Sequence, residues 1–151
     1  MPDFKESRIL NYTQKQLYDL VLDVEKYPEF IPYCKTCKII ERKKNELTAD
    51  LSIAFGFTTK TYKSSVVHGV VDNKYFVNAT QISGPFKYLI TKWVFEKYEE
   101  QKTKIYFEID FQFESEITNI MVGAMFKKAC MTMVKAFEIR AKEIYGTYNQ
   151  N

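Results

Sequence analysis

The longest helical pattern in the chain runs from Ser115 to Tyr145 and reads SEITNIMVGAMFKKACMTMVKAFEIRAKEIY. An apolar residue recurs at every third or fourth position, which places these side chains on one face of a helix. That stripe comprises Val122, Phe126, Ala129, Met133, Phe137, Ala141 and Ile144. The opposite face carries Lys127, Lys128, Lys135, Glu138 and Lys142, and Gly146 suits a helix end. We therefore predict one long helix over 115–145, whose apolar stripe needs a partner surface.

The first half of this predicted helix is apolar on several faces. Around Val122 and Phe126 lie Ile117, Ile120, Met121, Ala124 and Met125. A helix of this kind is usually buried, or it meets a ligand, a partner or a bilayer. Two interpretations stay open: a neighbouring loop covers these residues, or this half of the helix closes over an apolar cavity.

The residues before this helix alternate between apolar and polar, which predicts strands. Leu47 to Phe57 and Ile105 to Phe113 are the clearest examples. A capping box at Thr13 and Gln16 starts a short helix over 14–25, and a helical turn follows at 29–31. We predict strands over 4–10, 38–42, 47–57, 60–71, 75–80, 86–98 and 105–113. Short connections imply an antiparallel sheet, which curls around the long helix into a two-layer α+β domain.

Composition narrows the class of protein. The 151 residues are 46% hydrophobic and 27% charged, which predicts a single globular domain over 1–146 and a polar tail over 147–151. The net charge of +3 comes mostly from Lys rather than from the Arg forks typical of nucleic-acid readers, so DNA is not expected as a partner. Without a signal peptide or a spanning segment of about 20 apolar residues, a cytoplasmic protein is expected.

The interior could be filled or hollow. The predicted inward side chains could fill the space by themselves: Phe55, Phe57, Trp93, Phe95, Phe111 and Phe113. A curled sheet with a helix across its mouth is, however, a recurrent way to build a ligand cavity. Methionines at 121, 125, 131 and 133 suit either a flexible apolar guest or ordinary gap filling.

Candidate catalytic and metal sites are weak. Cys34 and Cys37 form a CxxC, but a zinc site needs about four ligands, and only Cys130 and His68 remain. The lone histidine lies within a predicted strand with no nucleophile at a motif spacing, so a satisfied or exposed strand histidine is expected. We predict no metal, no cofactor and no catalytic residue.

Residues 24–34, VEKYPEFIPYC, resemble the signature of the coenzyme Q-binding protein family. That family is also grouped with the bacterial ribosome-association toxins in the START-like superfamily of polyketide cyclases and lipid transporters. The segments GPFKYL (84–89), WVF (93–95), FQFE (111–114) and MVKAFEIRA (133–141) are also similar to it. The resemblance covers nearly the whole chain, from Phe4 to Tyr145.

The resemblance implies a helix-grip fold and an apolar tunnel between sheet and helix. It implies ubiquinone or another isoprenoid quinone as ligand, and a lipid chaperone that supports respiration rather than an enzyme. The expected tunnel lining is Phe30, Tyr33, Phe55, Phe57, Trp93, Phe95, Phe111, Phe113, Met121, Met125, Met133 and Phe137. The apolar start of the long helix would then be a gate, or a transient contact at the inner face of the membrane.

A second interpretation comes from the same resemblance. The chain would be a toxin-like binder of the large ribosomal subunit that blocks subunit association. A third, a cyclase or hydrolase, requires polar groups that converge inside the cavity, and the sequence offers no candidate pair.

Overall fold

A curved antiparallel sheet carries a long helix across one face. The computed structural model describes residues 3–55, 57–123 and 125–146, so the predicted tail over 147–151 lies outside the described residues. The elements follow one another as β1 (Asp3–Leu10), α1 (Gln14–Leu22), the 3-10 helix η1 (Val24–Glu29), β2 (Cys34–Lys43), β3 (Glu46–Phe55), β4 (Thr58–Val71), β5 (Lys74–Ser83), β6 (Phe86–Glu99), β7 (Lys102–Phe113), α2 (Glu116–Gly123) and α3 (Phe126–Tyr145).

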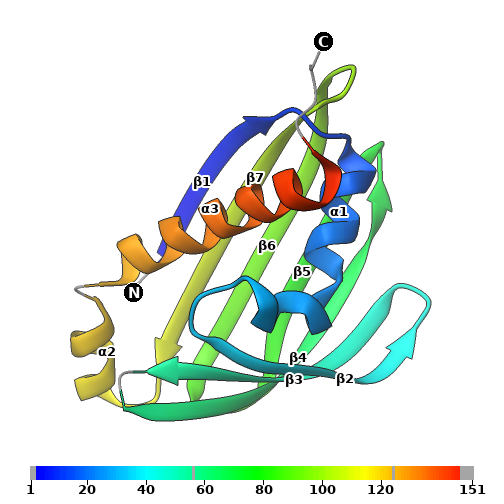
Figure 1. The fold of residues 1–151 in the computed structure, drawn as a ribbon. Coiled ribbons are helices and arrows are strands. Elements are labelled where there is room, and N and C mark those ends of the chain that lie inside the picture. Colours follow the sequence, from blue (N-terminus) through cyan, green and yellow to red (C-terminus); the bar gives the residue numbers. More distant parts are fainter. Residues whose placement is uncertain (1–2, 56, 124, 147–151) are drawn as a thin grey trace.

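The sheet has seven strands in the order β1-β7-β6-β5-β4-β3-β2, and each neighbouring pair is antiparallel (Figure 1). The predicted α+β helix-grip architecture is thus confirmed, including the short helices after the first strand. Tight connections place consecutive strands side by side in the sheet. Between β4 and β5, for example, Asp72 and Asn73 adopt positive φ of 53° and 65°. Asn and Asp tolerate this left-handed conformation, which suits a two-residue hairpin.

The predicted capping box begins α1. The Thr13 hydroxyl accepts a hydrogen bond from the Gln16 backbone N–H at 3.1 Å, and the Gln16 side chain accepts one from the Thr13 N–H at 2.9 Å. Two backbone donors that have no partner within the helix are satisfied in this way. Leu17, Leu20 and Val21 then bury the apolar face of α1 against the core.

Helix α3 crosses the concave face of the sheet (Figure 1). Its buried side chains are Phe126, Cys130, Val134, Phe137 and Ala141. The buried stripe therefore lies slightly to one side of the predicted one. Ala129 and Met133 are half-buried, Ile144 is 52% exposed, and Cys130 and Val134 take the deeper positions.

The prediction of one unbroken helix over 115–145 is wrong, because the chain bends between α2 and α3 (Figure 1). Asn119 gives a physical reason. Its side-chain oxygen accepts from the Phe113 N–H at 2.7 Å, and its amide donates to the Phe113 carbonyl at 3.1 Å. These two bonds hold α2 at the end of β7, while α3 has to run back across the sheet. Gly123, a poor helix former, ends α2 at the bend.

Candidate functional site

The space between the sheet and α3 is filled at one end by interlocked aromatic rings. Trp93 on β6 has its ring centroid 4.5 Å from Phe107 of β7 and 5.0 Å from Phe137 of α3. Phe95 stacks on Trp93 at 6.0 Å and is fully buried. Nearby lies a void of about 10 Å³, which is room for about one water molecule. No lipid fits into this part of the interior.

A second aromatic cluster fills the space near the ends of β6 and β7. Phe86 stacks on Phe113 with ring centroids 4.6 Å apart, and the ring centroid of Phe111 lies 4.8 Å from that of Phe126 at the start of α3. Tyr62 of β4 meets the edge of Phe86 at 5.5 Å. Four of these rings are buried, and Tyr62 is partly buried against them.

The inner face is less completely covered along β3 and β4. Leu47 and Ala49 are 1% and 0% exposed, but the next two residues on the same face, Leu51 and Ile53, are only partly buried. Tyr62, which pairs with Leu51 across the sheet, is also partly buried. The alternation therefore continues inward beyond the point where the helices cover it. We call the partly buried residues of this region the open-end surface: Phe30, Ile31, Leu51, Ile53, Tyr62 and Met133.

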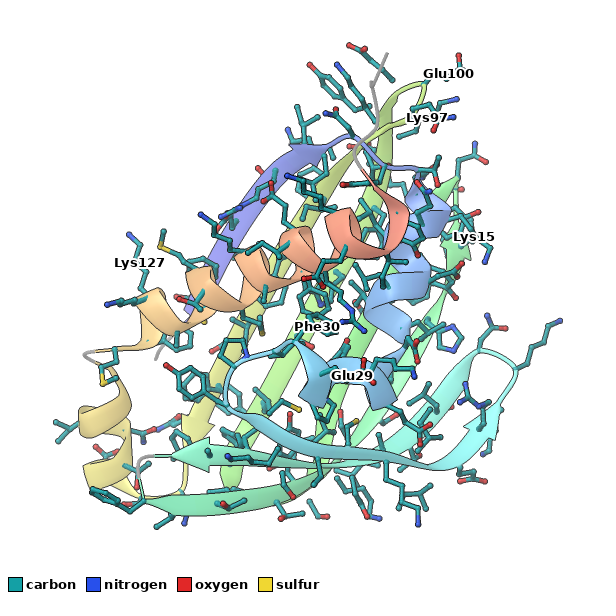
Figure 2. The ribbon with its side chains drawn as sticks, in the orientation of Figure 1. Lys15, Glu29, Phe30, Lys97, Glu100 and Lys127 are labelled. Carbon is teal, nitrogen blue, oxygen red and sulfur yellow. The ribbon has the colours of Figure 1, made fainter. Side chains whose placement is uncertain are left out.

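An arginine joins η1 to α3 beside this surface. Arg140 donates to Glu29 at 2.7 Å, and its guanidinium lies 5.0 Å from the centre of the Phe30 ring. The hydrogen bond from Arg140 lowers the pKa of the Glu29 carboxyl. Phe30 and Tyr27 both meet Phe137 edge to face, at 5.3 and 5.4 Å, and Figure 2 shows Glu29 and Phe30 beneath α3. We call this group the Arg140 clasp.

The predicted lining residues fall into three groups. Buried in the aromatic clusters are Trp93, Phe95, Phe111, Phe113 and Phe137. Partly buried on the open-end surface are Phe30 and Met133. Largely exposed are Tyr33 at 58% and Met125 at 66%, while the side chains of Phe55 and Met121 lie outside the described part of the chain.

The expectation that Phe57 points inward is wrong. Its side chain is fully exposed, because β3 ends at Phe55 and β4 begins at Thr58. Phe57 thus lies in the connection, where the two-residue alternation of a strand no longer applies. Sequence reasoning also missed Tyr27, Tyr62 and Arg140. The resemblance had included Tyr27 and Arg140 in two separate motifs, and the structure brings those motifs into contact.

Neither the cysteines of β2 nor His68 is set up as a reactive group. Burial raises the pKa of Cys34 to about 11 and that of Cys37 to about 12, so both are thiols at neutral pH. His68 is hydrogen-bonded through Nδ1 to the Tyr18 hydroxyl at 2.7 Å, and burial lowers its pKa. Among the described residues, no group of three or more His, Cys, Asp or Glu could hold a metal ion. Within the same residues, no helix is long and apolar enough to cross a membrane.

Two known proteins match nearly the whole of this chain. The ribosome association toxin RatA of Rickettsia prowazekii is 37% identical over 145 residues, covering 95% of this chain and 99% of the relative. The mitochondrial coenzyme Q-binding protein of Dictyostelium discoideum is 31% identical over 144 residues, covering 93% and 69%.

The fold also matches a solved structure. An aromatase/cyclase from Streptomyces sp. R1128, Zhui, superposes with a TM-score of 0.82 over 95% of both chains, at 12% identity. At that identity the likeness concerns the fold alone. Residues 10–138 match the family described as polyketide cyclase/dehydrase and lipid transport. The chain therefore belongs to the polyketide cyclase/dehydrase and lipid transport family.

Proposed function

We propose that this chain is a ribosome-associating protein that binds the large ribosomal subunit and blocks its joining to the small subunit. The observation that carries the proposal is the match to the Rickettsia relative, which extends over almost the full length of both chains at 37% identity. The match covers the segments that carry the surface of the molecule as well as those that form its core.

The described interior supports a binder rather than an enzyme. Its polar side chains are engaged with one another instead of converging on an empty space. The Tyr18 hydroxyl is hydrogen-bonded to His68 at 2.7 Å, the Thr103 hydroxyl donates to the Tyr12 carbonyl at 2.7 Å, and the Ser64 hydroxyl donates to the Thr80 carbonyl at 3.4 Å. A general acid or base would have to reach a substrate, and these groups are already occupied by structural contacts.

Sedimentation in a sucrose gradient tests the proposal. Purified protein mixed with ribosomes at subunit-joining magnesium concentrations should migrate with the large subunit and increase the proportion of free subunits. Binding should weaken as salt rises, because lysine contacts to phosphate are screened. A gradient in which the protein stays at the top, with joined ribosomes unchanged at low salt, would refute the proposal.

The open-end surface favours a second candidate function. It presents partly buried apolar side chains from the inner face of the sheet, from the end of η1 and from α3, and a hydrophobic ligand could lie against them. The relative from Dictyostelium is named for binding coenzyme Q. We propose that an isoprenoid quinone occupies this surface, with Phe30, Ile53 and Met133 against its tail. Burial of apolar tail at ~25 cal/mol per Å² would supply the affinity.

Extraction with organic solvent tests the second candidate. Protein purified from its own cells should release a quinone that mass spectrometry detects. Ile53→Trp should abolish this, because the indole would fill the open-end surface. The matched control is Ser52→Trp, which adds the same side chain to the outward face of β3. Extracts without quinone, or equal quinone in both variants, would reject this candidate.

A further inference from the structure

Three lysines form a line along the outer face of α3. Lys128, Lys135 and Lys142 are seven residues apart, and seven residues return a helix almost to the same angle. At 1.5 Å per residue the line extends over about 21 Å, with lysines about 10.5 Å apart. All three side chains are exposed. Figure 2 shows the neighbouring Lys127 projecting away from the sheet at the start of the helix. We call the three lysines the lysine ridge.

The acidic residues of α3 do not neutralise the ridge. Glu138 is engaged by Arg8 at 2.7 Å, and Glu143 lies 3.6 Å from Arg140. Within the described part of the chain, none of the three ridge lysines forms an ion pair. The outer face of α3 therefore carries uncompensated positive charge.

The outer face of the sheet is different. Several of its lysines lie beside carboxylates: Lys63 pairs with Asp50 at 3.2 Å, and Lys74 pairs with Glu96 at 3.3 Å. Lys92 is directly opposite Glu108 in the register of β6 and β7. Alternating charges of this kind cancel over a few ångströms. A polyanion would therefore be attracted to α3 rather than to the sheet.

The chemistry of the ridge favours RNA over a bilayer. A helix that lies on a membrane inserts its apolar face, often with aromatic side chains. The apolar face of α3 is already buried against the sheet. Between the lysines the outer face offers Met131 and Ile139, which are 44% and 50% exposed, and no aromatic residue. Lysine binds phosphate as a point charge and needs no insertion.

We propose that the lysine ridge contacts the phosphate backbone of ribosomal RNA; this inference rests on the proposed ribosome association and names the surface that performs it. Phosphate contacts fix position and orientation without reading sequence. The buried stripe of α3, with Phe137 5.0 Å from Trp93, packs the helix on the sheet and leaves the three lysines on the side that faces solvent.

The test compares two triple variants with the same change in charge. Lys128, Lys135 and Lys142 are replaced by Gln in the first, and Lys87, Lys92 and Lys97, exposed on β6, are replaced by Gln in the control. Binding to isolated large subunits is measured across salt concentrations. The ridge variant should bind at least ~10-fold more weakly at low salt, and its log–log salt slope should fall by about 2–3. The control should stay within about twofold of the parent protein.

Further arms separate the possible failures. Circular dichroism is used to check that both variants are folded. A third variant with Arg at the three ridge positions should restore binding to the large subunit. Unchanged binding by the ridge variant, while the parent binds, would overturn the ridge and leave the ribosome proposal intact. A parent protein that does not bind would overturn both. A ridge variant that loses binding to anionic phosphatidylglycerol vesicles but not to ribosomes would assign the ridge to a membrane and overturn the RNA contact.

Discussion

Replacing Phe137 by Ala should destabilise the protein strongly. The ring is 6% exposed and lies between three others, with centroids 5.0 Å from Trp93, 5.3 Å from Phe30 and 5.4 Å from Tyr27. It thus joins α3 to both the sheet and η1. Truncation removes these contacts and leaves a cavity, because helices and sheet collapse only partly around the loss.

The free energy of unfolding should fall by about 3–5 kcal/mol, the usual cost of a buried Phe→Ala change. For a domain of this size that corresponds to a decrease in Tm of about 6–20 °C. Phe137→Leu keeps an apolar side chain in place and should cost distinctly less. Ile139→Ala is the matched control, because Ile139 lies on the same helix but is 50% exposed. Its cost should stay within about 0.5–1 kcal/mol.

Urea unfolding followed by circular dichroism measures these differences, with the fluorescence of Trp93 as a second probe. Trp93 is the single tryptophan, and its contact with Phe137 makes it report on this packing directly. Coincident transitions from both probes would show two-state unfolding. A loss below about 1.5 kcal/mol in Phe137→Ala, or an equal loss in Ile139→Ala, would show that the rings do not hold α3 as the distances indicate.

Three further predictions concern the cap, the histidine and the thiols. Thr13→Ala should lower the free energy of unfolding by about 1 kcal/mol, measured by urea, and no change would mean the capping box is dispensable. The folded pKa of His68 lies below its ordinary value of 6.5, mainly through burial, so the unfolded chain takes up a proton first as the pH falls. Stability should therefore decline below about pH 6.5, and His68→Gln should flatten that decline; a parallel decline in both proteins would contradict this. Burial holds the pKa of Cys130 at about 12 and that of Cys37 at about 12, so iodoacetamide at pH 8 should label them slowly until urea is added. Rapid labelling of the folded protein would refute that prediction.

Most of the sheet could be predicted from sequence because its signals are local. Alternation along β3 and β7, the Asp72–Asn73 turn and the capping box at Thr13 each depend on residues within a few positions of one another. The same local reasoning was wrong at Phe57, where alternation was extended beyond the strand end. It was also wrong at the bend between α2 and α3, because Asn119 acts on β7 and not on its own helix.

The candidate site was harder to predict because its contacts join distant parts of the chain. Arg140 and Glu29 are 111 positions apart, and Phe30 and Phe137 belong to opposite ends of the sequence. Periodicity says which face of an element is apolar but not which other element covers it. The coverage of Leu47 and the exposure of Ile53, on the same face of the same strand, therefore could not be distinguished before the helices were placed.

The two proposed binding surfaces lie on opposite sides of one rigid element. The open-end surface faces the inner side of α3, and the lysine ridge occupies its outer side, with the buried stripe of α3 between them. Proteins that share a fold perform different functions, because function depends on the sites that each sequence places on that fold. A hydrophobic guest inside and a polyanion outside therefore need not compete for any residue. If Ile53→Trp abolishes quinone binding without affecting ribosome binding, and the ridge variant loses ribosome binding but keeps the quinone, the two activities are independent. A variant that loses both activities would require that the bound quinone moves α3.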